Sequence, residues 1–108
     1  MKKYNLKKNT TDIYELVIYQ LNPIKKRKEW KIIHKNLTDK LFLIPGCLRI
    51  DTYKLLSSNN IFCDYVYWDS IKNAYIGKKK FKSFIGFDKM MFYIKKILFS
   101  GIFYKSND

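Results

Sequence analysis

The single histidine of the chain, His34, is the residue best suited to acid–base chemistry. Imidazole is the only side chain whose ordinary pKa lies near neutral pH, so His34 could act as a general base beside a ligand cleft. It directly follows Ile33, at the edge of a stripe of apolar residues. The alternative is a half-exposed helix residue without a chemical role, and the sequence leaves both interpretations open.

A tryptophan, Trp68, stands where the aromatic segment IFCDYVYWD (61–69) gives way to a helix start at Ser70. Trp68 could form the wall of an aromatic pocket, or it could be a large plug for the core. Asp64 lies on the same strand face as Trp68, because even spacing along a strand returns to the same side. It could take part in catalysis, or it could form a structural ion pair with Arg49 or a lysine.

Several well-defined site motifs are absent from the sequence. Cys47 and Cys63 are the only cysteines, and with one histidine they do not complete a four-ligand zinc site. There is also no glycine-rich phosphate loop, nucleophile elbow or paired-carboxylate motif. We therefore expect no metal and no cofactor. An enzyme of this kind would rely on its substrate, on O₂ and on a desolvated aromatic pocket.

Four strands are expected to position these residues, at 13–21, 47–56, 61–69 and 97–104, the last with Gly101 as a candidate bulge. The turn residues SSNN at 57–60 join the second and third strands in a hairpin. This register places Cys47 opposite a residue near 70 and Cys63 opposite one near 54. The two thiols would be too far apart for a disulfide, so both are expected to be free.

Helices are predicted between these strands. Asn22 is a candidate N-cap with Pro23 in the first turn, and Pro45-Gly46 ends this first helix. Its apolar stripe recurs at spacings of three and four residues: Trp30, Ile33, Leu37, Leu41 and Ile44. A second helix follows the N-cap Ser70 and places near one side Ile71, Ala74, Tyr75, Lys78 and Phe81. A short third helix, capped by Asp88, is predicted to run through Lys95.

The order β-α-β-β-α-(α)-β predicts an α+β, ferredoxin-like βαββαβ fold, with a four-stranded antiparallel sheet and helices on one face. Residues 13–108 would form one domain behind a flexible basic arm at 1–12. Segment 13–21 is apolar on both faces, and Tyr65 and Tyr67 extend the face away from the helices. That second face needs a cover. We expect a homodimer through it, forming an α+β barrel.

The charge points to no specific partner. Lysine and arginine number 22 against 9 acidic residues, a net charge of +13. Only Arg27 and Arg49 are arginine, the residue that phosphate and base recognition favours. Richness in Lys, Asn, Ile, Phe and Tyr is typical of an AT-rich coding sequence. We interpret the lysine runs as solvated helix faces and expect no nucleic-acid partner.

No apolar run approaches the roughly 20 residues of a membrane span, and no signal peptide is recognisable, so a cytoplasmic protein is expected.

Three segments, IPGCLRIDTYK, FCDYVYWDSIKNA and the aromatic terminal strand, resemble the antibiotic biosynthesis monooxygenase-like family of dimeric α+β barrels. The resemblance covers about 13–104. It includes the helix that carries His34, the Pro45-Gly46 break, and the turn formed by Trp68, Asp69, Ser70, Ile71 and Ala74. It implies barrel-like homodimers with a ligand cleft between sheet and helices. Some members oxidise phenols or quinols with O₂ and without metal or flavin, others degrade haem, and many have no established activity.

The family's site residues carry over in part. Members that oxidise polyketides have a strand Trp, which Trp68 matches, and an Asn four residues earlier, where this chain has Asp64. An ionised Asp cannot donate a hydrogen bond and would repel an oxyanion. The helix Tyr of those members aligns with Ala74, one residue before Tyr75. Haem-degrading members have a histidine on that helix, whereas none follows His34 here, so haem degradation is not expected.

The candidate site therefore comprises His34 and Asp64 as catalytic residues, with Trp68 and Tyr75 as substrate-binding residues. The first hypothesis is a cofactor-free monooxygenase-like enzyme that acts on an aromatic phenol or quinol. A small-ligand-binding barrel without catalysis is the second hypothesis, and a basic nucleic-acid-associated protein is the third.

Overall fold

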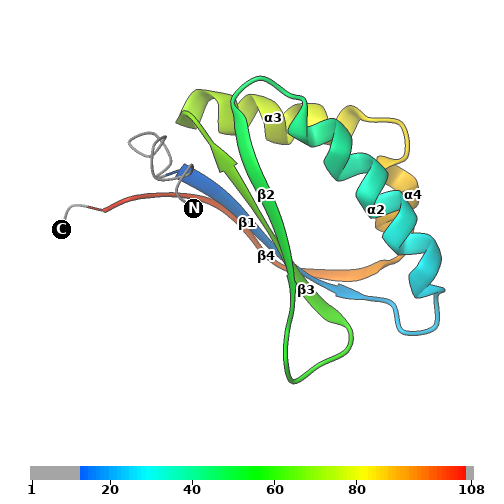
Figure 1. Ribbon diagram of the computed structural model, residues 1–108. Coiled ribbons are helices and arrows are strands. Elements are labelled where there is room, and N and C mark those ends of the chain that lie inside the picture. Colours follow the sequence, from blue (N-terminus) through cyan, green and yellow to red (C-terminus); the bar gives the residue numbers. More distant parts are fainter. Residues whose placement is uncertain (1–12, 107–108) are drawn as a thin grey trace.

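A four-stranded antiparallel sheet carries all the described helices on one of its faces (Figure 1). The computed structural model describes residues 13–106, and the predicted arm at 1–12 lies outside the described residues. The sheet order is β2-β3-β1-β4, which confirms the ferredoxin-like fold. The elements are β1 (Ile13–Leu21), α2 (Arg27–Phe42), β2 (Cys47–Lys54), β3 (Ile61–Trp68), α3 (Ile71–Ser83), α4 (Phe87–Phe92) and β4 (Ile94–Tyr104).

Helix α2 begins later than the sequence predicts. Its N-cap is Lys26, and Asn22 instead accepts a hydrogen bond at Oδ1 from the backbone N–H of Ile24, 3.1 Å away. The backbone N–H groups of Leu21 and Asn22 are still bound to Asn60 and Tyr93. The chain must therefore leave the sheet through a turn before helical dihedrals can start.

The C-terminal elements also differ from the prediction. Gly86, not Asp88, is the N-cap of α4, which ends at Phe92. Strand β4 starts at Ile94, directly after the buried Tyr93, whose carbonyl accepts a hydrogen bond from the backbone N–H of Asn22, the residue after β1. Gly101 pairs regularly with Leu16, so it forms no bulge.

The irregularities of β4 lie at residues 95 and 98 instead. Ile18 faces Phe99 and Tyr19 faces Ile97, so Leu98 is the extra residue of one of these bulges. The bulge turns Ile97 toward the helices, while Phe99 stays on the opposite face of the sheet. Strand β4 thereby contributes to both faces.

The hairpin register agrees with the prediction to within one or two residues. Cys47 lies opposite Trp68 and Cys63 opposite Tyr53, and both thiols are free. Burial raises the pKa of Cys47 to about 11, so this thiol stays protonated at neutral pH. None of the helices within residues 13–106 is both long and apolar enough to cross a membrane.

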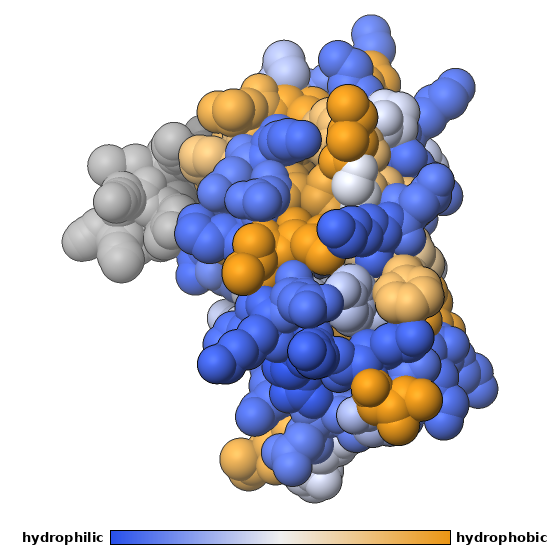
Figure 2. All heavy atoms as spheres, turned by 90° about the vertical axis from the view of Figure 1, so that its right-hand side faces the viewer, coloured by the Kyte–Doolittle hydropathy of each residue, from blue (hydrophilic) through white to orange (hydrophobic). Residues whose placement is uncertain are grey.

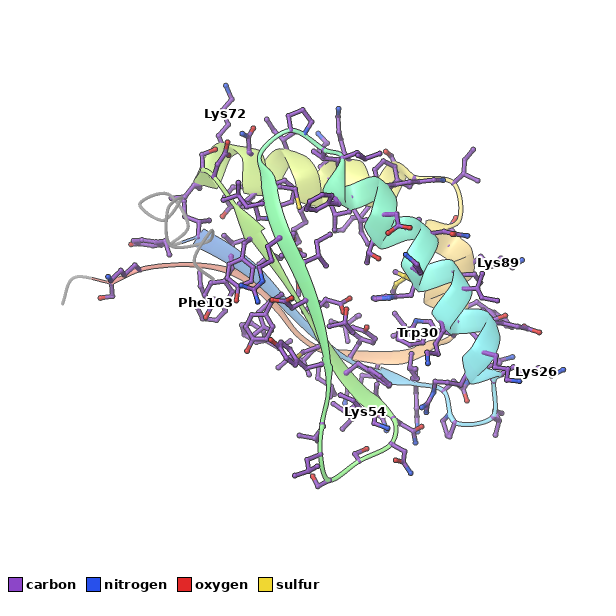
Figure 3. All side chains as sticks on the ribbon, in the orientation of Figure 1. Lys26, Trp30, Lys54, Lys72, Lys89 and Phe103 are labelled. Carbon is purple, nitrogen blue, oxygen red and sulfur yellow. The ribbon has the colours of Figure 1, made fainter. Side chains whose placement is uncertain are left out.

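The helix side of the sheet holds two buried apolar clusters. One gathers around Trp30, Leu37 and Tyr19, and the other around Trp68, Leu41 and Val66. Trp30 points from α2 toward the sheet, whereas the labelled lysines of the helices point outward (Figure 3). Hydrophilic residues cover much of the face in Figure 2, with apolar residues scattered among them. The predicted α2 stripe is confirmed, since four of its five members are buried: Trp30, Leu37, Leu41 and Ile44.

Candidate functional site

A cavity of about 510 Å³ lies between the sheet and the helices, with walls from both apolar clusters. Its volume suits a small organic ligand. Most of the lining is apolar, and the polar residues gather in two groups. The apolar walls include Val17, Leu41, Ile50, Val66, Phe81, Phe87, Met90, Met91, Ile94 and Ile97.

The first polar group joins His34 of α2 to Asp64 of β3. His34 Nε2 lies 3.0 Å from Asp64 Oδ2. Tyr19 and Thr52 donate their hydroxyls to Asp64 Oδ1, over 3.2 Å and 2.7 Å. The side chains of His34 and Asp64 are 12% and 18% exposed. The predicted catalytic pair is thus brought together at the cavity wall.

The contact with Asp64 fixes which imidazole nitrogen carries the proton. A carboxylate only accepts hydrogen bonds, so the Nε2–H of His34 donates to it. In a neutral imidazole Nδ1 is then unprotonated. No residue within 13–106 donates a hydrogen bond to Nδ1. This is the arrangement in which a carboxylate orients an imidazole whose other nitrogen can take up a proton.

Two aromatic residues hold this pair in place. Tyr19 is 2% exposed, and its burial beside Asp64 raises the pKa of its hydroxyl far above the ordinary value. Tyr19 therefore remains a hydrogen-bond donor at every physiological pH. The ring of Trp30, one helical turn before His34, lies 4.8 Å from the imidazole between centroids. The imidazole thus packs against a buried wall on one side.

Within residues 13–106, Asp64 pairs with neither Arg49 nor a lysine. Arg49 lies on the other face of the sheet, where its Nε is 2.7 Å from Asp51 Oδ2. The even and odd positions of β2 and β3 face opposite ways, which separates the two side chains. The sequence-based alternative, an ion pair of Asp64 with Arg49 or a lysine, is therefore wrong. Asp64 pairs with His34 instead.

The second polar group centres on Glu15 of β1, which is 7% exposed. Lys78 and Lys82 of α3 line the same cavity, and Lys78 Nζ donates to Ser100 Oγ over 3.2 Å. Burial raises the pKa of Glu15, and the two lysines partly offset this effect. Lys78 therefore belongs to the cavity, contrary to the interpretation of its lysine run as a solvated face.

The raised pKa of Glu15 predicts a distinctive dependence of stability on pH. Below the ordinary carboxyl value of 4.5 both states are protonated. Above it the unfolded chain ionises first, so the free energy of unfolding falls until pH exceeds the raised folded value. The groups facing Glu15 from other elements are Lys78, Lys82 and Asp64.

Urea unfolding across this range should show Glu15→Gln gaining stability relative to wild type as pH rises, and then a plateau. Glutamine has the same shape but does not ionise, which makes it the matched comparison. A difference independent of pH would contradict the desolvated carboxyl.

Trp68 does not line the cavity. It is 0% exposed and packs in the second cluster against α3. A side-chain carbon on Gly77 would overlap its ring, so the ring occupies the space that this glycine leaves open. The geometry thus favours the core-plug interpretation over the pocket wall.

Tyr75 is 62% exposed on α3 and also lies outside the cavity lining. The predicted helix face is rotated, because the small residues Ala74 and Gly77 turn toward the Trp68 ring. Ser70 does cap α3, by accepting a hydrogen bond from Asn73 N–H. The helix start was therefore readable from the sequence, whereas the buried face was not.

Sequence reasoning missed Tyr19 and Glu15 as cavity residues, and it missed Thr52 as a hydrogen-bond donor to Asp64. The available signal was Glu15, a single acidic residue at an inward position of an otherwise apolar strand. Metal chemistry has no candidate ligand set in the part of the chain that the structure describes, where no three His, Cys, Asp or Glu residues cluster.

Comparison with known proteins identifies the fold. No family model matches the sequence, and no curated protein matches it. Among solved structures, a conserved protein from Methanosarcina mazei Go1 is 17% identical with a TM-score of 0.70, over 90% of this chain and 95% of that one.

Two further similar structures have names that refer to oxygenases. A Bordetella bronchiseptica protein provisionally named an antibiotic biosynthesis monooxygenase is 11% identical, with a TM-score of 0.67 over 87% of this chain and 96% of its own. A variant of SnoaB, a cofactor-independent oxygenase from Streptomyces nogalater, is 10% identical, with a TM-score of 0.68 over 89% and 93%. The chain therefore has the ferredoxin-like α+β fold of the antibiotic biosynthesis monooxygenase-like proteins, which is the fold that the sequence resemblance implies.

Proposed function

We propose that this protein is a cofactor-independent monooxygenase that oxidises an aromatic phenol or quinol in the cavity between sheet and helices. The observation that carries the proposal is the His34–Asp64 pair, 3.0 Å apart in the wall of a largely apolar cavity. The oxygenase among the structurally similar proteins adds support at the level of fold.

In this proposal His34 Nδ1 takes the proton from a ligand hydroxyl, and Asp64 stabilises the imidazolium that forms. Asp64 acts through His34 and is a positioning residue. The electron-rich phenolate then reacts with O₂ directly. For a quinol, one oxygen atom enters the ring and the other leaves as water, and the quinol supplies all four electrons. The apolar lining keeps solvent from the reactive anion.

The proposed partner is a second copy of the chain, bound through the sheet face away from the helices. Tyr14 stacks on Phe103 with centroids 5.3 Å apart and lies 5.5 Å from Tyr65. Phe103 lies on the side of the sheet opposite the helices (Figure 3). No element within residues 13–106 covers these rings. A nucleic-acid partner is not proposed, because Arg27 and Arg49 both bind groups of this chain.

The reaction is tested by O₂ consumption with a naphthoquinol, corrected for its spontaneous oxidation. Replacing His34 by alanine should lower turnover by about 10²–10⁴-fold, the usual effect of losing a general base. Binding of the quinol, measured by calorimetry, should change by less than about threefold. Asp64→Asn should also lower turnover and shift the pH profile, because the imidazolium loses its carboxylate.

Lys35→Ala is the matched control on the same helix, since the Lys35 side chain is exposed and, among the residues that the structure describes, pairs with Asp39 alone. It should retain wild-type turnover. Saturable quinol binding without O₂ consumption by wild type would contradict the enzyme and leave a ligand-binding barrel.

A further inference from the structure

Glu15 is the least explained polar residue of the cavity. It is more than nine-tenths buried, lines the cavity, and makes no hydrogen bond or ion pair with any residue in 13–106. Burying a carboxyl without a partner costs stability, and an apolar residue would fit this inward strand position better. The cost indicates that Glu15 serves the ligand.

The polar groups around Glu15 include both hydrogen-bond donors and hydrogen-bond acceptors. Lys78 of α3 and Ser100 of β4, which bind each other, also line the cavity. Asp64 is a diagonal neighbour, because Glu15 pairs with Val66 and Asp64 pairs with Val17 on the adjacent strand. Diagonal neighbours on one sheet face lie about 7–8 Å apart, so one small molecule can reach both polar groups of the cavity.

This wall does not suit a charged substituent. Lys78 and Lys82 disfavour a ligand cation, and the carboxyls of Glu15 and Asp64 disfavour a ligand carboxylate. A neutral hydroxyl or carbonyl can use the carboxyl and the ammonium together.

We propose that Glu15, Lys78 and Ser100 form a second subsite, which binds a neutral oxygen substituent of the ligand whose first hydroxyl lies at His34. The inference rests on the proposed ligand site and makes it more specific. The preferred ligand is an aromatic molecule with oxygen substituents at two separated positions, and a ligand with a single hydroxyl is bound less tightly.

Calorimetric titration with two probes tests the subsite without requiring turnover. The probes are a naphthalenediol with hydroxyls at its two far ends and the naphthol that lacks one of them. Wild type should bind the diol about tenfold more tightly, the effect of one good hydrogen bond. Glu15→Leu should abolish this preference and change naphthol affinity by less than about threefold.

Thermal unfolding of the same variant separates a binding role from a structural one. Glu15→Leu should be at least as stable as wild type, because it removes an unpartnered buried carboxyl. Asp88→Asn, an exposed acid outside the cavity, should keep the tenfold preference. Destabilised Glu15→Leu that still prefers the diol would show a structural role and overturn the subsite.

The outcomes distinguish the two proposals. Equal wild-type affinity for diol and naphthol would overturn the subsite alone. A tenfold preference that depends on Glu15, without O₂ consumption, would support the subsite and overturn the oxygenase reaction. Failure of both probes to bind saturably would overturn both.

Discussion

Replacing Trp68 by alanine is expected to cost about 3–5 kcal/mol of unfolding free energy, the usual effect of deleting a large buried aromatic side chain. Trp68 is fully buried at the end of β3 and packs on Leu41, Val66 and Ala74. Alanine would leave a cavity that the flanking strand and helix can only partly close. Urea unfolding monitored by circular dichroism measures the loss.

Tyr75→Ala is the matched control, since Tyr75 is 62% exposed on the helix that packs on Trp68. It should change stability by no more than about 0.5 kcal/mol. Trp68→Phe should leave naphthol binding unchanged, because Trp68 does not line the cavity. Weaker naphthol binding by a stably folded Trp68→Phe protein would restore the pocket-wall interpretation.

The close contact between Trp68 and Gly77 leads to a related prediction about the stability of a Gly77→Ala variant. Alanine at 77 would place its methyl group within the Trp68 ring, so it should destabilise by roughly 1–3 kcal/mol through overpacking. Helix propensity alone would favour alanine over glycine by about 1 kcal/mol. In a Trp68→Phe background the penalty should shrink, and a double-mutant cycle measures this coupling.

A lysine in place of Leu16 is expected to dissociate the proposed homodimer. Leu16 lies at the centre of the aromatic sheet face, between Tyr65 of β3 and Gly101 of β4. In a face-to-face dimer the two-fold symmetry would bury two unpaired ammonium groups. The expected cost is about 3–5 kcal/mol, which weakens association at least about a hundredfold.

Analytical ultracentrifugation at micromolar concentration should show wild type near twice 13.1 kDa, the mass of a dimer. The Leu16→Lys variant should sediment near 13.1 kDa, the mass of one chain. Ile24→Lys is the control, because Ile24 is 84% exposed in the turn before α2, away from the sheet face. A wild-type monomer at all concentrations would contradict the dimer. A Leu16→Lys protein that keeps the wild-type mass would place the interface elsewhere.

The sequence by itself determined the order of the elements and the hairpin register, because local patterns specify them. Runs rich in β-branched and aromatic residues mark β1 and β3, and three-and-four spacing marks α2. Ser70 caps α3 by accepting a hydrogen bond from Asn73, three residues along the chain, so this helix start is a local feature. The resemblance to the monooxygenase-like proteins rests on these same local motifs, and the structure confirms the fold they imply.

Only the tertiary structure decided which residues share the cavity. His34 and Asp64 are 30 positions apart, and their contact depends on how α2 crosses the sheet. The rotation of α3 follows from the steric fit of Gly77 to Trp68, and it sends Tyr75 outward and Lys78 inward. These are long-range packing effects, which no local pattern encodes. For the same reason Glu15, a lone acid on an apolar strand, gained its significance only when the cavity wall around it was known.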